Sequence, residues 1–224
     1  METAAADLKL PADYSSASDE NGINMTLLIQ NPSFEDGLNG WTYFKGDDTQ
    51  SADNNNATYH MELADGSYVF NTWSGSIPAD GLYVSQELKA LPAGTYELQA
   101  VLASDKGNKI DLTANGAGMP FEIPEKEAGV ELGEKNIGIE ASIIFKLEEK
   151  GNVTIKASSK SWFKVDNFRL TFYGTESAKE ETEIEDIEIA KTPATGILYN
   201  LLGQPVNKSY KGIIIKDGKA YLNN

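Results

Sequence analysis

An alternation of apolar and polar residues, typical of strands, dominates the chain between residues 27 and 174. From Asn136 to Leu147 every odd position is apolar, and the residues between them are mostly polar or small. The same pattern recurs over residues 96–102, 110–114, 153–157 and 168–172. Successive side chains of a strand point to opposite faces, so these segments are predicted to be half-buried strands. Turn-forming pairs separate them and no stripe of helical period is sustained, so we expect an all-β fold, an antiparallel β-sandwich.

The composition changes after residue 174. Residues 176–189 carry seven acidic residues against one lysine, and the first half of this segment is predicted to be a solvated linker. A second β pattern then begins, in which Asp217-Gly218 is a typical two-residue hairpin turn. We therefore divide the chain into an N-terminal extension (1–24), a sandwich (25–174), an acidic linker (175–183) and a small C-terminal β unit (184–224). The last unit is small for an independent core, so we expect it to pack on the sandwich or on another domain.

The composition excludes several classes of function. The chain has no cysteine and one histidine, which excludes thiol catalysis, disulfide scaffolds and zinc sites built from cysteines or several imidazoles. Its 34 acidic residues outnumber 19 basic ones, so nucleic acid is a poor partner, whereas neutral or cationic ligands such as Ca²⁺ remain. No apolar run approaches the roughly 20 residues of a membrane span. The first residues do not form a signal peptide, which leaves either a cytosolic protein or one whose signal has been removed.

Three motifs carry a resemblance to a known family. The segments LLIQNPSFEDGLNGWTYF, YVSQELKALPAGTYELQAVLAS and SWFKVDNFRLTFYG resemble the opening, middle and closing strands of galactose-binding-domain-like jelly rolls, especially carbohydrate-binding modules of families 4, 9 and 22. The C-terminal segment ILYNLLGQPVNKSYKGIIIKDGKAYLNN is similar to the β segments, including sorting-type tails, of secreted bacterial proteins that handle polysaccharides. These resemblances imply an extracytoplasmic protein, secreted or at the cell surface, whose signal has been removed. They also imply a poly- or oligosaccharide ligand and neighbouring glycan-utilisation proteins as partners.

A calcium site is the second implication of the resemblance. Asp166 shares the parity of Phe168 in the last strand, so we expect its carboxylate to point toward the core, where it needs a partner. Modules of this kind hold a structural Ca²⁺, and oxygen-only ligands suit such a hard cation. Carried over by resemblance, the ligands are the side chains of Glu35, Asp166 and Asp65, with backbone carbonyls near Ser33 and Tyr68. The alternative is that Asp166 caps a turn and Glu35 is exposed to solvent.

Sugar-binding modules rely on aromatic platforms, so the aromatic residues must be divided between core and surface. Trp41 is expected in the core. Asn71 and Trp73 alternate against an apolar row, which makes Trp73 a platform candidate with Asn71 as its polar neighbour, although packing under a loop is equally compatible with the pattern. Tyr83 alternates with mostly apolar residues and so lies on the opposite face of its strand. It would form one platform with Trp73 if their strands pair. Trp162, in the loop before the last strand, is either a loop platform or a lid on the sandwich end.

No catalytic constellation is present in the sequence. A serine nucleophile has only His60 as a base, and pairs of acidic residues are too easily found among 34 to indicate a glycosidase. We therefore expect a non-catalytic carbohydrate-binding or accessory module, stabilised by Ca²⁺, with Trp73, Tyr83, Asn71 and Trp162 as its sugar-binding residues. The alternative is a structural, adhesion or spacer protein with a C-terminal docking or sorting unit and no glycan ligand. Glycoside hydrolysis is a weaker third possibility.

Overall fold

The computed structural model describes residues 13–124 and 138–182, together with the strand residues 198–200, 205–206, 212–216 and 219–223. The chain divides into two compact units, Met1–Ile184 and Glu185–Asn224. Each unit is described by itself.

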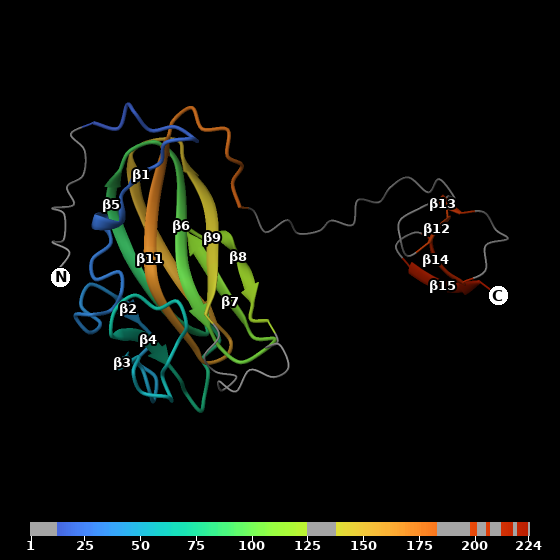
Figure 1. Cartoon of the computed structure of the whole chain (residues 1–224), viewed down its shortest axis with the longest axis horizontal. Helices are drawn as coiled ribbons and strands as arrows, with labels where there is room; N and C mark the ends of the chain where they lie inside the picture. The colour runs from blue at the N-terminus through green and yellow to red at the C-terminus, as the bar shows by residue number, and fades with distance from the viewer. Residues whose placement is uncertain are drawn as a thin grey trace, which may run out of the picture. The chain divides into compact units, whose positions relative to one another are not determined.

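The first unit is built almost entirely from β-strands (Figure 1). They are β1 (Ile23–Asn24), β2 (Thr42–Tyr43), β3 (Gln50–Asp53), β4 (Tyr68–Thr72), β5 (Leu82–Leu91), β6 (Gly94–Ala103), β7 (Lys109–Ala114), β8 (Ala117–Glu122), β9 (Ile139–Leu147), β10 (Gly151–Ser159) and β11 (Phe163–Gly174). One short 3₁₀ turn, η1 (Thr26–Leu28), follows β1. Among the described residues no helix is long and apolar enough to cross a membrane.

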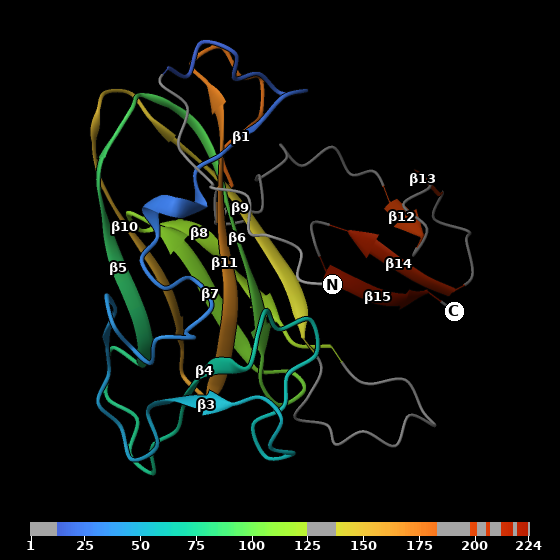
Figure 2. The same cartoon turned by 60° about the vertical axis from the view of Figure 1, so that its left-hand side comes forward.

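The strands form two antiparallel sheets. The six-stranded sheet has the order β3-β4-β11-β6-β9, with β1 also paired to β11, and the five-stranded sheet has the order β2-β5-β10-β7-β8. Figures 1 and 2 show them as two layers, with β11 and β6 in one and β5 and β10 in the other. The prediction of an antiparallel β-sandwich is therefore confirmed.

The main core fills the space between the two sheets. Alternate residues of β5, β6, β10 and β11 supply most of it, as the sequence pattern predicted. Trp41 is buried as expected, with its ring centroid 5.1 Å from that of Phe34 and 4.8 Å from that of Phe168, and its indole Nε1 donates to the carbonyl of Asn31 at 2.9 Å. The motif that resembles the family opening thus fastens the first loop onto the last strand.

A β-bulge in β11 reverses the alternation of its side chains. Asn167 adopts a left-handed conformation with φ of 51°, and the register with β6 shifts between Asp166 and Arg169. After the bulge, Phe168 faces the main core, whereas before it the core residues are Phe163 and Val165. Asp166 therefore faces the opposite, outer side of the sheet, so the prediction that it points into the sandwich core is wrong, although its burial is complete.

A second, smaller apolar cluster covers this outer face. Ala52, Met61, Val69, Val101 and Ala103 form it, with Tyr59 and Ala64 packed against them. Val101 and Ala103 are the β6 partners of Asp166 and Lys164, so both charged residues of β11 lie on this side. The segment 54–67, here called the covering loop, closes over them. Its two ends are joined by a hydrogen bond from the Asn54 N–H to the Ser67 carbonyl at 2.8 Å.

Segments that precede and follow the predicted sandwich in the sequence are hydrogen-bonded to it. Ile23 and Asn24, placed by the sequence in the N-terminal extension, pair with β11. In the segment predicted as a linker, the Thr182 N–H donates to the Ile144 carbonyl at 2.7 Å, and the Thr182 hydroxyl accepts from the Ile144 N–H at 2.7 Å. The described part of the acidic segment is thus hydrogen-bonded along the edge strand β9.

The second unit is a small four-stranded sheet with the order β13-β12-β14-β15. Its strands are β12 (Leu198–Asn200), β13 (Pro205–Val206), β14 (Gly212–Lys216) and β15 (Lys219–Asn223). β14 and β15 pair antiparallel, with Lys216 opposite Lys219. The predicted hairpin turn at Asp217-Gly218 lies outside the described residues.

Candidate functional site

Residues in and around β4, together with residues next to the start of β11, line a pocket of about 190 Å³. Figure 1 shows β3 and β4 at one end of the sandwich. The pocket opens on the outer side of the six-stranded sheet, beside the covering loop. The lining residues are Asp48, Thr58, Tyr59, Asn71, Trp73, Asp105, Trp162 and Lys164. Three of the four residues predicted to bind sugar, Asn71, Trp73 and Trp162, are therefore brought together.

The two tryptophans are held by different means. Trp73 directly follows β4, and its backbone N–H and carbonyl exchange two hydrogen bonds of 3.1 Å with the backbone of Asp48. Trp73 is 49% exposed, so part of its ring is open to solvent beside the pocket. Trp162 is half-buried, and its Nε1 donates to Asp105 Oδ2 at 2.7 Å, which fixes the orientation of the indole ring.

Asp48 is the polar centre of the pocket. Its Oδ2 accepts hydrogen bonds from Asn71 Nδ2 at 3.1 Å and from the Tyr59 hydroxyl at 3.4 Å, and its Oδ1 accepts one from Gln50 Nε2. Asn71 is 5% exposed and also donates to the Asp48 carbonyl at 3.1 Å. These bonds connect the β3–β4 hairpin to the pocket and hold its oxygen acceptors in fixed positions.

Lys164 forms the floor of the pocket. It is 1% exposed, and its Nζ donates to the carbonyls of Thr58 at 3.2 Å and His60 at 3.1 Å. The same ammonium lies 5.7 Å from the centre of the Trp162 ring, within the range of a cation–π interaction. A buried ammonium needs such partners because its desolvation is costly, so Lys164 ties the covering loop to β11.

Tyr83 lies elsewhere. It belongs to β5 in the five-stranded sheet, whereas Trp73 follows β4 in the six-stranded sheet, so the two strands do not pair. Tyr83 is opposite Ser158 of β10, and Lys156 Nζ lies 5.1 Å from the centre of its ring. A shallow groove of about 620 Å³ nearby is lined by polar residues and glycine alone, namely Asp111, Thr113, Asn115, Gly116, Thr154, Lys156 and Ser158. Tyr83 is therefore separate from the tryptophan pocket.

The residues predicted to bind calcium form an acidic cluster at the other end of the covering loop. Asp166 Oδ2 accepts from the Asp65 N–H at 2.7 Å, and Glu35 Oε1 accepts from the N–H groups of Ser67 at 2.8 Å and Tyr68 at 2.7 Å. The Ser33 hydroxyl donates to Asp65 Oδ2 at 2.9 Å. These bonds join the five predicted residues into two sets, Ser33 with Asp65 and Asp166, and Glu35 with Tyr68.

Asp166 is the member of this cluster whose hydrogen bonding is incomplete. It is fully buried, and its Oδ1 has no hydrogen-bond partner. Burial raises the pKa of Asp166 to about 8, against the effect of hydrogen bonds from the backbone of Asp65 and Asn167, and the charges of Asp65 and Glu35 raise it further. In residues 13–124 and 138–182, no three carboxylate or imidazole side chains converge closely enough to form a ready-made metal site. The orphaned Oδ1 is nevertheless an oxygen that fits a hard cation.

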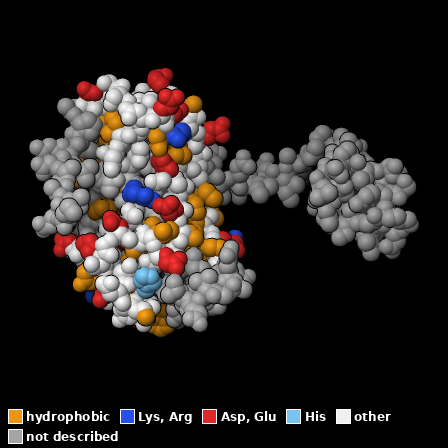
Figure 3. Space-filling view, viewed as in Figure 1, with side chains coloured by type: hydrophobic (Ala, Val, Ile, Leu, Met, Phe, Trp, Pro, Cys, Tyr) orange, Lys and Arg blue, Asp and Glu red, His pale blue; other side chains and the backbone are white. Residues whose placement is uncertain are grey.

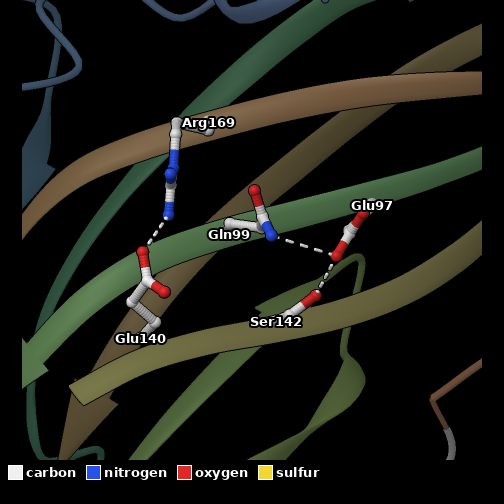
Figure 4. Close-up of polar contacts among 5 residues, drawn as sticks. All are labelled: Glu97, Gln99, Glu140, Ser142 and Arg169. Atoms are coloured by element: carbon white, nitrogen blue, oxygen red, sulfur yellow. Dashed lines mark hydrogen bonds and ion pairs between the residues drawn. The ribbon is translucent and has the colours of Figure 1, made fainter. Parts of the chain in front are cut away.

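A third polar group lies on the outer face of β11, β6 and β9 (Figure 4), and its only buried atom without a hydrogen-bond partner among the described residues is Arg169 Nε. Glu97 accepts hydrogen bonds from Gln99, Ser142 and the Tyr173 hydroxyl, and Arg169 Nη2 lies 2.9 Å from Glu140 Oε1. Burial acts to raise the pKa of Glu97, but the hydrogen bonds from Ser142 and Tyr173 outweigh it and lower the pKa. Arg169, the one arginine of the sequence, therefore forms a surface ion pair with Glu140.

Sequence reasoning missed several residues of the tryptophan pocket. Asp48 and Asp105 belong to loops, where acidic residues are common and carry no distinguishing pattern. Lys164 alternates with core residues in a strand, and a polar residue at such a position usually signals the solvent face. The one available signal in the sequence is their neighbourhood to Trp162, because aromatic side chains and a few polar groups together line ligand pockets.

No protein-family model matches the sequence, and no curated protein matches it. Among solved structures, the chain is similar to TmCBM61 in complex with β-1,4-galactotriose, with 24% identity, 64% of this chain and 96% of that chain covered, and a TM-score of 0.45. It is also similar to the CBM22-1 xylan-binding domain of Paenibacillus barcinonensis Xyn10C (14% identity, 64% and 92% covered, TM-score 0.40). A third is a carbohydrate-binding module of family 4 (9% identity, 64% and 99% covered, TM-score 0.42). Similarity at this level says nothing about the ligand of this chain.

Proposed function

We propose that this chain is a non-catalytic glycan-binding module that holds a sugar in the pocket between Trp73 and Trp162. The observation that carries the proposal is the exposed Trp73 beside an oriented Trp162 and fixed oxygen acceptors. A sugar ring presents C–H groups that pack on an indole face, and its hydroxyls donate to carboxylates such as Asp48. Most of these polar groups are already fixed by their own hydrogen bonds, so little ordering is needed when a ligand binds.

The module acts outside the cytoplasm as an accessory to glycan utilisation, together with other cell-surface proteins. The three sequence motifs and the C-terminal segment support this part of the proposal through the resemblance they carry. In the pocket, Asp48 accepts three side-chain hydrogen bonds and Asp105 accepts one from the Trp162 indole, so both carboxylates help to hold the pocket in shape.

Calorimetry and affinity gel electrophoresis against a panel of soluble plant and host glycans test the proposal. Trp73→Ala is expected to abolish binding with folding preserved, because the side chain is 49% exposed and lies outside both apolar clusters. Tyr83→Ala is the matched control, since it removes an aromatic ring outside the pocket. If no glycan binds, or if Trp73→Ala binds like the wild type, the chain is better described as a spacer or adhesion protein. Release of reducing sugar from the same panel would indicate a glycosidase.

We also propose that a structural Ca²⁺ binds at the acidic cluster. Asp166 and Glu35 would hold it with side-chain oxygens, assisted by Asp65 and by the carbonyls of Ser33 and Tyr68. The proposal is supported by the buried Asp166 Oδ1, which has no partner, and by the raised pKa of this carboxyl, which a cation would lower. The ion would supply positive charge that compensates two or three neighbouring carboxylates.

Thermal melting with calcium and with EDTA tests the ion. A ligand that binds only the folded state raises the melting temperature by mass action, so we expect a higher value with calcium. Asp166→Asn is expected to remove this difference. An unchanged melting temperature in the wild type would refute the calcium proposal.

A further inference from the structure

We infer that the tryptophan pocket selects neutral sugars and rejects sugars that carry a carboxylate. This inference rests on the proposed function of the pocket and specifies its ligand class. It is carried by the charged groups that line and border the pocket, which are mostly acidic.

Two carboxylates line the pocket directly. Asp48 is fixed by Asn71, Tyr59 and Gln50, so its oxygens cannot swing away from an incoming anion without breaking those bonds. Asp105 is fixed through the hydrogen bond from Trp162 Nε1 at 2.7 Å. Both groups therefore present acceptor oxygens, which match the hydroxyls of a neutral sugar and repel a uronate.

A third carboxylate, Asp47, lies against the two residues that follow Trp73. Asp47 Oδ2 accepts from the Gly75 N–H at 2.8 Å and from the Ser74 hydroxyl at 3.2 Å. A Cβ placed on Gly75 would lie 3.6 Å from the Trp73 ring and 3.8 Å from Asp47 Oδ2, so the indole edge and this carboxylate both lie beside Gly75. An anionic sugar stacked on Trp73 would approach this carboxylate.

Among the described residues that line the pocket, Lys164 is the one lysine or arginine. Lys164 lines the pocket, but it is 1% exposed and its Nζ donates to the carbonyls of Thr58 and His60. To bind a uronate it would have to exchange contacts that hold the covering loop. The rest of the molecule also repels an anionic sugar. The chain has a net charge of -15, and acidic side chains outnumber basic ones on the face shown in Figure 3.

The pocket volume of about 190 Å³ sharpens the inference. It lies below the roughly 300 Å³ at which pockets for drug-sized ligands begin, which fits a single sugar residue. A C6 carboxylate on such a residue would share the pocket with Asp48 and Asp105. Like charges held this close without a free counter-charge are expected to weaken binding by about tenfold or more.

The test uses two matched pairs of methyl glycosides, glucoside with glucuronide and galactoside with galacturonide, in ligand-observed NMR titrations. We expect the neutral member of each bound pair to bind about tenfold more tightly, with the gap reduced at high salt. Asp105→Asn keeps an acceptor for Trp162 Nε1 and removes one charge, so it should reduce the difference in affinity between the neutral and the acidic glycoside. Asp111→Asn, in the groove on the other sheet, should leave it unchanged.

The outcomes separate the two proposals. A wild-type protein that binds a neutral glycoside and binds its acidic partner equally or more tightly overturns this inference and leaves the glycan-binding proposal intact. An unchanged gap in Asp105→Asn also overturns it, because the selection would then not come from the pocket charge. Failure to bind any member of either pair, or any glycan of the panel, overturns the glycan-binding proposal and this inference with it.

Discussion

In the metal-free protein, Asp166 is expected to make stability fall with rising pH. Burial raises the pKa of Asp166 to about 8, above its ordinary value of 3.8. Because the folded value is the higher one, the proton on Asp166 stabilises the fold fully below the unfolded value, and this contribution is lost as the pH rises through about 8. Asp166→Asn replaces the neutral carboxyl by an amide that does not titrate, so it should remove the effect.

The magnitude follows from the difference between the two pKa values. One unit corresponds to about 1.36 kcal/mol. From about pH 5.5 to about pH 8.5 the unfolded carboxyl is ionised, whereas the folded one is largely protonated until the upper part of the range, so the free energy of unfolding should fall by about 3 kcal/mol. Glu97, whose pKa is lowered, contributes in the opposite sense, and only near or below its ordinary value of 4.5.

Urea denaturation in EDTA at the two pH values, followed by tryptophan fluorescence, measures this loss. The wild type should lose about 3 kcal/mol more than Asp166→Asn. Asp111→Asn is the control, because Asp111 lies in the groove of the five-stranded sheet. This variant should show the same change in the free energy of unfolding between the two pH values as the wild type. If the free energy of unfolding changes equally with pH in the wild type and in Asp166→Asn, the assignment of the effect to this buried carboxyl is refuted.

Three further substitutions test the fold and the pocket. Trp162→Phe keeps a ring but removes the 2.7 Å bond to Asp105, so glycan affinity in calorimetry should fall by about fivefold, a loss of about 1 kcal/mol, with stability nearly unchanged. Phe168→Ala removes a fully buried ring between Phe34 and Trp41 and should cost about 3–5 kcal/mol in the free energy of unfolding measured by urea denaturation. Asn167→Val places a β-branched residue at a φ of 51° and should cost about 1–2 kcal/mol, whereas Asn167→Gly should be close to neutral.

The sequence predicts the sheets well because alternation is a local property. Each strand needs only its own residues to show which face is apolar, and the buried rows of β6 and β10 follow the pattern without interruption. The bulge at Asn167 has no such signal, since it is defined by the pairing of β11 with β6. One additional residue in the strand moves Asp166 and Lys164 to the outer face, which no period-two count can show.

The pocket was predicted in part for the same reason. Asn71 and Trp73 share a face through alternation within one segment, so their neighbourhood could be inferred. Trp162 and Asp105 meet because β11 begins where β6 ends, which depends on the order of strands in the sheet. Tyr83 shows the converse limit, because alternation places it on a polar face but does not say to which sheet that face belongs.

The covering loop connects the tryptophan pocket to the acidic cluster, and this connection yields a final prediction. Near one end the loop accepts hydrogen bonds from Lys164 through the carbonyls of Thr58 and His60, and near the other the Asp65 N–H donates to Asp166. Lys164 and Asp166 lie on the same face of β11, two residues apart, so a charge change at Asp166 acts on the segment that walls the pocket.

If Ca²⁺ binds at Asp166, it should order the covering loop and thereby raise glycan affinity, with a coupling of about fivefold or more. Calorimetry of the wild type with calcium and with EDTA measures the coupling directly. Asp166→Asn should bind glycan with the same affinity in both conditions, because its cation site is removed. Since coupling is reciprocal, saturating glycan should also tighten calcium binding by the same factor. If calcium stabilises the wild type but leaves its glycan affinity unchanged, the two sites are not coupled through the covering loop.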